Sequence, residues 1–511
     1  MNEDQRRQVR ENAKYLQAVR PIDPGEIHEY VEGVPHPAAV RQVLREKAPA
    51  LGLIERADGR FEPVADGPME ATVRAIDRLP EGIFRTLEDA LVEQYGPGWP
   101  DGESGEALRS AIRDFKRRYL LDAPVTYDER TALGYAIYHL PPYFAAVQYA
   151  LGELLADGLV PNHLRVLDVG AGVGGPALGI DALVPDDALV EYHAVEPSQA
   201  AAVCDTLLET TGRNFHPTVH RLPIEEFERG DQGEPEEFDL VLCANVLSEL
   251  DDPEGVLAGL LDRLTPEGTV LALAPADRNT AIQLREIERT VEEQTDATKY
   301  APTVRLWPGK RPESTSWSFR RHPDLDVPGF QRRLDEGRRT DAERACEETG
   351  NRETDGNQSG DSDHPGDTDG TGARPVPPAG SGEFVNVDVQ YAYSLLRRDG
   401  KTAVEFRPDP GRFAPMATMD EHVTDRIDCV GIKLSHDLAE GGNPLYLVGD
   451  GSQHVDHFAV VTSESALNRD LGTAEYGDLL VFENVLVLWN DDERAYNLVV
   501  DGETVVERIP A

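Results

Sequence analysis

Cysteine is scarce in this chain of 511 residues. The four cysteines, Cys204, Cys243, Cys346 and Cys429, lie far apart in the sequence. Zinc sites and iron–sulfur clusters need cysteines at close and regular spacing, so the sequence predicts no metal centre. Cys204 and Cys243 lie in apolar segments and are expected in the core.

Long apolar segments are also missing. No stretch approaches the roughly 20 consecutive apolar residues that a membrane-spanning helix needs. The opening residues MNEDQRRQVREN are polar and lack the apolar centre of a signal peptide. We therefore expect a soluble, cytoplasmic protein without a membrane partner.

Positive charge is in short supply. The chain has 94 Asp and Glu against 50 Lys and Arg, of which only seven are lysines, and its formal net charge is -44. Molar salt shortens the screening length to about 3 Å and suppresses the repulsion among dispersed acidic groups. The composition thus predicts a halophilic, archaeal source. An acidic nucleic-acid mimic is the alternative, although a mimic would not need the cofactor loop described below.

The length allows about three domains. Residues 5–50 are predicted to form helices, and GLIERADGRFEPV after them a strand pair that turns at Asp58 and Gly59. This order predicts a winged-helix-like or helical module over residues 1–65. Two roles remain open for it: docking of nucleic acid or protein, and service as a cap over the next domain.

Three more helical segments are expected before the first long apolar strand. Together they would form a helical cap over residues 66–160 that covers one face of a sheet. The expected helices lie at 70–95, 104–120 and 138–158.

The segment HLRVLDVGAGVGGPALG at 163–179 is the most informative part of the chain. An apolar strand leads directly into a glycine-dense turn, with Asp168 two residues before the first glycine. Gly170, Gly172 and Gly174 lack Cβ atoms, so the chain can turn sharply and a nucleotide-type cofactor can lie against its amides. These four residues are therefore predicted to bind a cofactor.

The glycines alone leave the identity of the cofactor open. Gly170, Gly172 and Gly175 also fit a dinucleotide pattern, with Glu196 at the spacing of its ribose-binding acid. The order D-x-G-x-G, then V-E-P ending a strand, then F-D-L-V before a polar turn at Asn245 favours S-adenosylmethionine. Glu196 and Asn245 are therefore added to the predicted cofactor contacts, with the Glu196 carboxylate accepting from the ribose hydroxyls.

Strands alternate with helices after residue 163. This pattern predicts an α/β fold, the Rossmann-like, doubly wound sheet of a class I methyltransferase, over residues 161–334 and 383–400. The further strands are expected at 189–198, 217–222, 237–250 and 268–275, and a helix near 253–264.

Residues 335–382 are rich in Gly, Asp, Thr, Ser and Pro and contain almost no large apolar residue. Such a segment cannot bury enough surface to offset the entropy lost on ordering, so a disordered acidic linker is predicted. The flanking segments 314–321 and 385–400 are expected to pair as the last strands of the sheet.

Residues 401–511 change to an all-β pattern. Three strands, a helical piece and two more strands predict an OB-like β-barrel, a fold that often presents aromatic side chains to single-stranded nucleic acid. Trp489 and Tyr496 lie near strand ends and are the candidate RNA-binding residues. Phe482 alternates with aliphatic residues and is expected in the core.

Several segments together resemble a known family. In order they are YHLPPYFAAVQYALGEL, VLDVGAGVGGPALG, FDLVLCANVLSELDD, RLWPGKRPESTSWSFRRH and VDVQYAYSLLRRDG. They resemble the methyltransferase-like family associated with the mitochondrial small ribosomal subunit and its prokaryotic relatives, over roughly residues 105–510 outside the linker. The resemblance implies a class I methyltransferase fold, a C-terminal barrel, and the small ribosomal subunit or its rRNA as partner.

The chain departs from that family at one segment. Many members carry cysteines where this chain has residues 302–319, and the resemblance implies an iron–sulfur cluster there. This segment has no cysteine, so no cluster is expected. Trp307, Trp317 and Phe319 are predicted to fill the space as an apolar substitute.

The sequence assigns no catalytic residue. Asn245, Ser248 and Glu249 are expected to face the site, but the last two can equally begin the next helix. The favoured function is S-adenosylmethionine-dependent methylation of the small ribosomal subunit or its rRNA. The alternatives are a non-catalytic ribosome-binding assembly factor with the same fold and, less favoured, a nicotinamide-dependent oxidoreductase.

Overall fold

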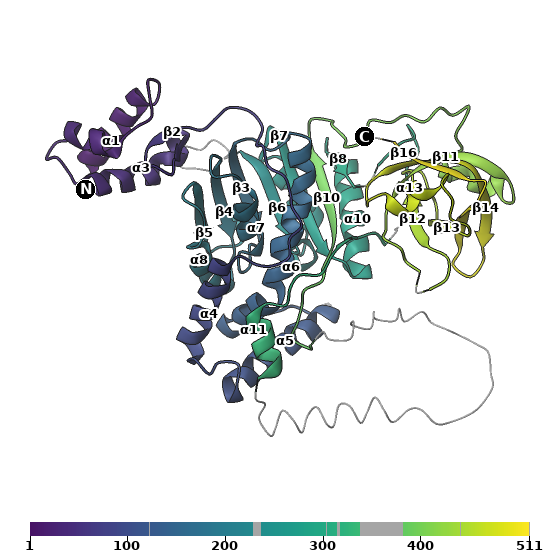
Figure 1. The fold of residues 1–511 in the computed structure, drawn as a ribbon, viewed down its shortest axis with the longest axis horizontal. Coiled ribbons are helices and arrows are strands. Elements are labelled where there is room, and N and C mark those ends of the chain that lie inside the picture. The colour runs from purple at the N-terminus through teal and green to yellow at the C-terminus, as the bar shows by residue number, and fades with distance from the viewer. Residues whose placement is uncertain are drawn as a thin grey trace.

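The computed structural model describes residues 1–121, 123–227, 237–302, 304–313, 317–337, 382–439 and 441–509. Three parts follow one another along the chain: a small helical unit, a central α/β sheet, and a β-barrel beside the far edge of that sheet (Figure 1). Most of the predicted linker, residues 338–381, lies outside the described residues.

The N-terminal unit has its own small core. An Asn2 capping box with Gln5 begins the first helix, and Gly52, with φ of 62°, ends the third. The helices pack Val9, Leu44 and neighbouring apolar side chains against the strand pair. Its elements are α1 (Glu3–Leu16), α2 (Pro24–Ile27), η1 (His28–Tyr30), α3 (Pro37–Leu51), β1 (Leu53–Glu55) and β2 (Phe61–Pro63).

The central sheet confirms the predicted α/β fold. Its order is β5-β4-β3-β6-β7-β10-β8, with β9 paired to β10, and the strands β5 to β7 along this order run parallel. β10 runs antiparallel to its neighbours β7 and β8. The strands are β3 (His163–Val169), β4 (Leu189–Val195), β5 (Phe215–His220), β6 (Phe238–Ala244), β7 (Leu264–Pro275), β8 (Thr298–Ala301), β9 (Arg320–His322) and β10 (Val389–Arg397).

Helices cover both faces of this sheet (Figure 1). Alternate residues of each strand belong to two cores: Val166 and Leu242 pack beneath α6 and α7, whereas Leu167 and Val241 pack beneath α9 and α10. The helices are α4 (Glu81–Tyr95), α5 (Gly102–Leu120), α6 (Glu129–Ala156), α7 (Gly175–Leu183), α8 (Ala200–Leu208), η2 (Ile224–Glu226), η3 (Leu247–Glu249), α9 (Pro253–Leu261), α10 (Arg278–Gln294) and α11 (Gly329–Glu336).

Some element predictions were wrong in detail. Residues 70–80 form no helix; they run extended between two prolines, Pro68 and Pro80, after the Met69 N–H donates to Val160 O. Helix α6 begins at Glu129, nine residues earlier than expected, because Asp128 caps it by accepting from the Thr131 N–H. Of the expected strand at 314–321, residues 320–321 belong to β9 and residues 317–319 form no strand, whereas residues 314–316 lie outside the described residues.

The C-terminal barrel confirms the OB-like prediction. Five strands close in the order β11-β12-β13-β15-β14, with β14 paired back to β11. Strands β13 and β15 are parallel to each other. Along the chain, helix α13 lies between β13 and β14. Phe482 is fully buried. The elements are η4 (Met416–His422), β11 (Arg426–Lys433), β12 (Leu445–Gly449), β13 (His457–Val461), α13 (Arg469–Thr473), β14 (Leu479–Asn490), β15 (Ala495–Val500) and β16 (Val505–Ile509).

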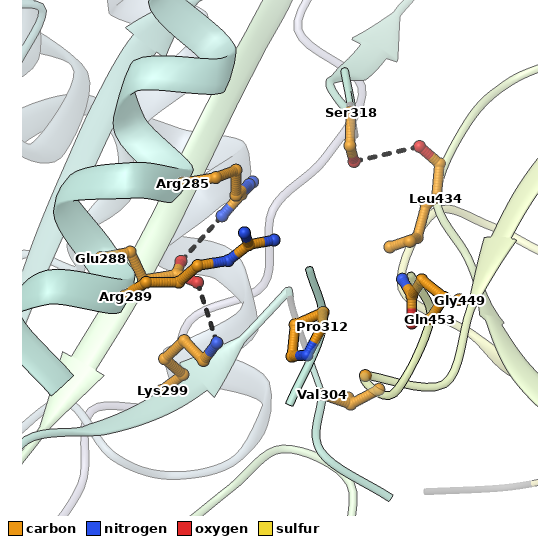
Figure 2. Close-up of a pocket in the computed structure, with 11 residues that line it drawn as sticks. Arg285, Glu288, Arg289, Lys299, Val304, Pro312, Ser318, Leu434, Gly449 and Gln453 are labelled. Atoms are coloured by element: carbon orange, nitrogen blue, oxygen red, sulfur yellow. Dashed lines mark hydrogen bonds and ion pairs between the residues drawn. The ribbon is translucent and has the colours of Figure 1, made fainter. Parts of the chain in front are cut away.

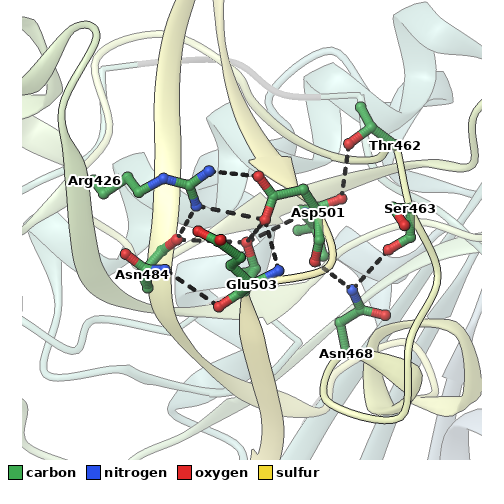
Figure 3. Close-up of polar contacts among 9 residues, drawn as sticks. Arg426, Thr462, Ser463, Asn468, Asn484, Asp501 and Glu503 are labelled. Atoms are coloured by element: carbon green, nitrogen blue, oxygen red, sulfur yellow. Dashed lines mark hydrogen bonds and ion pairs between the residues drawn. The ribbon is translucent and has the colours of Figure 1, made fainter.

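The expected last strand is split in two, because the chain turns at residues 501–504 before β16. A polar network holds this turn (Figure 3). The Arg426 guanidinium donates to the Asp501 carboxylate and lowers the pKa of Asp501 to about 2. The Asn468 amide donates to Ser463 O at 3.0 Å and to Asp501 O at 2.8 Å. This network joins the turn to the start of β11 and to the loop before α13.

The three aromatic residues that were predicted to form one apolar filling do not do so. Trp307 packs among apolar side chains of the barrel and donates its indole N–H to Asp450 at 2.7 Å. Phe319 packs against the sheet instead, with its ring 5.4 Å from that of Trp317, and Trp317 is 44 % exposed. Trp307 lies apart from the other two because residues 304–307 dock on the barrel, where the Leu306 N–H donates to Asp450 O at 3.1 Å.

None of the helices in the described part of the chain has the length and apolarity that crossing a lipid bilayer requires.

Candidate cofactor and acceptor site

The glycine loop after β3 combines two kinds of glycine. Gly170, Gly172 and Gly174 have φ values of 68°, 55° and 85°, a conformation that side chains with a Cβ rarely adopt. A Cβ on Gly170 would lie 2.5 Å from the Val246 side chain, and one on Gly174 3.1 Å from the Cys204 sulfur. A Cβ on Gly172 would meet nothing nearer than a carbonyl oxygen at 4.0 Å. Gly170 and Gly174 thus serve packing, whereas Gly172 faces open space that a ligand can use.

Glu196 holds this loop in place. Its carboxylate accepts from the Gly172 N–H at 2.9 Å and from the Ser198 N–H at 2.9 Å, and the residue is 7 % exposed. Each carboxylate oxygen has a second lone pair that can accept from a ribose hydroxyl. The geometry therefore brings together Glu196 and Gly172, as the sequence predicted, and adds a direct bond between them that the sequence did not reveal.

Asp168 lies fully buried at the end of β3. It accepts from the Tyr192 hydroxyl at 2.6 Å through one oxygen, while its Oδ1 has no hydrogen-bond partner. Burial raises its pKa to about 7; the nearby charge of Glu196 adds to this rise and the Tyr192 bond opposes it. An unpartnered carboxylate oxygen fits a cofactor that carries positive charge, and S-adenosylmethionine carries both a sulfonium and an ammonium group.

Asn245 follows β6 in a left-handed conformation, with φ of 61°. Its N–H donates to Leu273 O at 2.9 Å, and its side chain lines a small cavity with Ser248 and Thr280 on the side of α10. The neighbouring Val246, which the sequence analysis did not single out, packs against Gly170. The structure therefore places Asn245 between the end of β6 and β7, next to the residue that packs against Gly170.

A group of aromatic residues near the loop was missed. Tyr127 and its neighbours Tyr135, His139 and Tyr143, which we call the tyrosine cluster, come from α6 and the residue just before its cap. Their rings lie in contact: Tyr127 and Tyr135 are 5.5 Å apart, and His139 and Tyr143 are stacked at 5.1 Å. The cluster adjoins the loop, since a Cβ on Gly175 would lie 3.3 Å from the Tyr143 Cβ. The four-residue spacing of the last three members puts them on one helix face, a signal that was present in the sequence.

The tyrosine cluster meets a third carboxylate. The Tyr127 hydroxyl donates to Glu249 at 3.3 Å. Burial raises the pKa of Glu249, and the charge of Glu196 raises it further, so these two acids lie near each other. Burial also lowers the pKa of His139 to about 3, which keeps its ring neutral. Three carboxylates, Asp168, Glu196 and Glu249, and the phenols of the tyrosine cluster thus lie close to the glycine loop, an environment suited to a cationic cofactor.

The two candidate RNA-binding residues lie elsewhere, at facing positions of β14 and β15 in the barrel. Trp489 is 38 % exposed and donates its indole N–H to Asp491 at 2.8 Å. Its ring contacts Tyr496 at 4.8 Å, which in turn contacts His457 at 5.1 Å. The structure therefore brings Trp489 and Tyr496 together, apart from the cofactor loop.

Within the described residues, no group of three His, Cys, Asp or Glu side chains is arranged to hold a metal ion.

Three family models match parts of the chain. Residues 167–270 match a methyltransferase domain. Residues 6–57 and 417–509 match the N-terminal and C-terminal domains of DUF8157, described as a domain of unknown function. No curated protein matches the chain.

Solved structures of methyltransferases resemble part of the chain at low identity. The plantazolicin methyltransferase BpumL, in complex with a monoazolic desmethylPZN analog and SAH, is 15 % identical, covers 42 % of this chain and 68 % of its own, and has a TM-score of 0.24. An S-adenosylmethionine-dependent methyltransferase from Clostridium acetobutylicum is 15 % identical, with 26 % and 50 % covered and a TM-score of 0.21. The CcbJ methyltransferase from Streptomyces caelestis is 17 % identical, with 27 % and 55 % covered and a TM-score of 0.22.

The matched domain contains the glycine loop, Glu196 and Asn245. The chain thus carries a methyltransferase domain over residues 167–270, in which the glycine loop and Glu196 fit the predicted S-adenosylmethionine site. Neither the domain match nor these structures concerns the small ribosomal subunit.

The raised pKa of Asp168 predicts a pH dependence of cofactor binding. The ammonium of S-adenosylmethionine favours the ionised carboxylate, so affinity should rise with pH up to about 7 and level off above it. Calorimetric titration between pH 5.5 and 8.5 measures this slope. In the Asp168→Asn variant the affinity should be lower and the slope should disappear. An unchanged slope in that variant would assign the titration to another group.

Proposed function

We propose that this protein transfers the methyl group of S-adenosylmethionine to RNA of the small ribosomal subunit. The cofactor supplies an electrophilic methyl on a sulfonium, and transfer requires mainly that an acceptor atom be aligned with it. Glu196 and the Gly172 amide position the ribose side of the cofactor. The buried Asp168 offers its free oxygen to the positive charge.

The acceptor side is formed by Glu249 and the tyrosine cluster. Glu249 has a raised pKa because it is buried near Glu196, so its carboxylate can receive a proton from an acceptor that must lose one. The flat phenol rings offer surfaces on which a planar base can stack. We assign Glu249 as the candidate proton acceptor and Tyr127, which donates to it, as the residue that positions it.

One observation favours RNA as the substrate. The chain carries an OB-like barrel with a partly exposed tryptophan, Trp489, in ring contact with Tyr496. Bases of single-stranded nucleic acid stack on such side chains whatever their sequence. The overall negative charge does not oppose this at high salt, because screening removes most of the repulsion from phosphates while stacking persists.

A second candidate is a non-catalytic assembly factor whose cofactor is structural. It is favoured by the narrow space beside the turn after β6, where Asn245, Ser248 and Thr280 line a cavity of only about 10 Å³. This volume holds about one water molecule, so an acceptor could enter there only if η3 or α10 moved.

The Trp489→Ala variant tests the RNA role of the barrel. Loss of one stacked base, worth about 1–3 kcal/mol, should weaken binding of single-stranded small-subunit RNA roughly 5- to 150-fold. Cofactor affinity and melting temperature should stay the same. Leu488→Ala is the matched control, since Leu488 is the adjacent residue and equally exposed at 37 %. Equal RNA affinity of the two variants would remove the stacking role of Trp489.

A further inference from the structure

Two exposed aromatic side chains, Trp317 and Tyr119, are fixed at the carboxyl edge of the central sheet. We call them the edge aromatic pair. The Trp317 indole N–H donates to Ala276 O at 2.9 Å, and the Tyr119 hydroxyl donates to the Asp277 carboxylate at 3.3 Å. Trp317 is 44 % exposed and Tyr119 37 %. The polar atom of each side chain is therefore anchored on one of two consecutive residues, while the side chain stays partly open to solvent.

The two anchor residues lie on the edge of the sheet that carries the glycine loop. They directly follow β7, which runs parallel to β6 and, through it, to β3. Contacts lead there from the loop, because Val246 packs against Gly170. The neighbouring Asn245 donates its N–H to Leu273 O at 2.9 Å, three residues before Ala276. The edge aromatic pair is thus attached to the same edge as the predicted cofactor site.

The backbone around Trp317 is held on two sides. Phe319 is 9 % exposed and packs into the core of the sheet, with its ring 5.4 Å from that of Trp317. Ser318, between them, reaches the barrel instead: its hydroxyl donates to Leu434 O at 3.1 Å in the pocket between α10 and the barrel (Figure 2). Trp317 therefore presents a pre-positioned ring, which loses little conformational freedom when a ligand binds.

Tyr119 lies close to the tyrosine cluster. Its hydroxyl is 3.1 Å from the Thr280 hydroxyl in the first turn of α10. Burial of the hydroxyl raises the pKa of Tyr119, the Thr280 bond opposes this, and the charges of Asp277 and Tyr143 raise it further. Tyr143 belongs to the tyrosine cluster, so Tyr119 lies near both that cluster and the start of α10.

A positive charge follows directly on the anchor residues. Arg278 is the first residue of α10 and is exposed. A cation at this end of a helix is disfavoured by the helix dipole, so it does not stabilise α10. The Asp277 carboxylate is engaged as the helix cap, where it accepts from the Thr280 N–H at 3.1 Å. A guanidinium group matches the oxygens of a phosphate, so this stretch combines stacking surfaces with a phosphate contact, as single-stranded nucleic acid requires.

We infer that Trp317 and Tyr119 form the surface on which the nucleotide to be methylated stacks, with Arg278 at its phosphate. This inference rests on the proposed function, which supplies RNA as the substrate. Stacking tolerates any base, because every base has a flat π face. It also persists in molar salt, which screens the attraction between Arg278 and phosphate. The barrel would then hold one part of a single strand, and the edge aromatic pair the part that is methylated.

Binding of a fluorescently labelled single strand of small-subunit RNA, followed by anisotropy at high salt, tests this surface. Trp317→Ala and Tyr119→Ala should each weaken binding roughly 5- to 150-fold, the effect of losing one stacked base. Trp317→Phe keeps an aromatic ring but loses the bond to Ala276 O, and should stay within about threefold of wild type. Leu467→Ala is the control for an exposed apolar residue, at 49 %, and should bind like wild type. All five proteins should bind S-adenosylmethionine equally in calorimetry.

Two results would overturn the inference. One is unchanged RNA affinity in Trp317→Ala and Tyr119→Ala. The other is an equal loss in Trp317→Ala and Trp317→Phe, because the indole N–H bond rather than the ring would then determine affinity. Methyl transfer from labelled S-adenosylmethionine, measured in parallel, reports separately on the proposed function. Label in RNA with unchanged affinity of both alanine variants removes only the stacking surface. Weaker RNA binding by these variants, without label in the wild-type reaction, supports the stacking surface and removes methylation.

Discussion

The Gly172→Asp variant is expected to fold and to lose S-adenosylmethionine binding by at least about 100-fold. The position is open in the protein, since a Cβ there meets only a carbonyl oxygen at 4.0 Å. The aspartate would occupy the space of the cofactor and place a second carboxylate beside Glu196, whose Oε2 accepts from the N–H of residue 172. Calorimetric titration with S-adenosylmethionine measures the loss, and thermal unfolding reports the fold.

Gly400→Asp is the matched control for backbone strain. Gly400 has a φ of 75°, close to the left-handed values of the loop, and a Cβ there meets nothing within 4 Å. Any loss of stability from placing aspartate in this conformation should therefore appear in both variants. The loss of cofactor affinity should appear in Gly172→Asp alone. Wild-type cofactor affinity in Gly172→Asp would show that the cofactor lies elsewhere.

Removing the Glu196 carboxylate should have the second-largest effect. In Glu196→Ala the ribose loses its acceptor, which costs about 1.5–3 kcal/mol, or roughly 10- to 150-fold in affinity. The same change also releases the Gly172 and Ser198 N–H groups, so the loop itself should loosen. Glu196→Gln keeps one acceptor oxygen and should fall between alanine and wild type. Calorimetry at constant high salt gives all three affinities.

The informative result is that S-adenosylmethionine affinity increases from Glu196→Ala through Glu196→Gln to wild type. If Glu196→Ala bound S-adenosylmethionine as tightly as wild type does, the ribose assignment would be wrong. If the glutamine variant were as weak as alanine, the charge of Glu196 rather than its hydrogen bonds would determine affinity.

The sheet and barrel could be predicted because their signals are local. The strand at 163–169 is apolar and runs into glycines that need positive φ, and the barrel strands alternate between turn residues. The small strand β8, with only four residues, was missed because its pairing with β10 depends on contacts across nearly 100 residues of sequence. The extended segment at 70–80 was mistaken for a helix because its apolar residues pack against the domain rather than along a helix face.

For the sites too, features with a local sequence signal could be predicted, whereas those that depend on contacts between distant parts of the chain could not. The positions of Asp168, the glycines and Glu196 at one edge of the sheet could be predicted, because they lie at or directly after the ends of neighbouring parallel strands. The tyrosine cluster was visible as a four-residue spacing, but nothing local placed that helix face on the loop. The pocket between α10 and the barrel could not be predicted, because it joins Arg285 on a helix to Gln453 in the barrel, residues that only the tertiary fold brings together.

Methyl transfer itself is the most direct test of the account. Small ribosomal subunits from cells that lack the protein are incubated with it and with S-adenosylmethionine labelled on the methyl group, at high salt. The account predicts label in the RNA fraction with the wild-type protein and none with Gly172→Asp. Confirmed cofactor binding without label in RNA would contradict it and leave the non-catalytic assembly factor as the function.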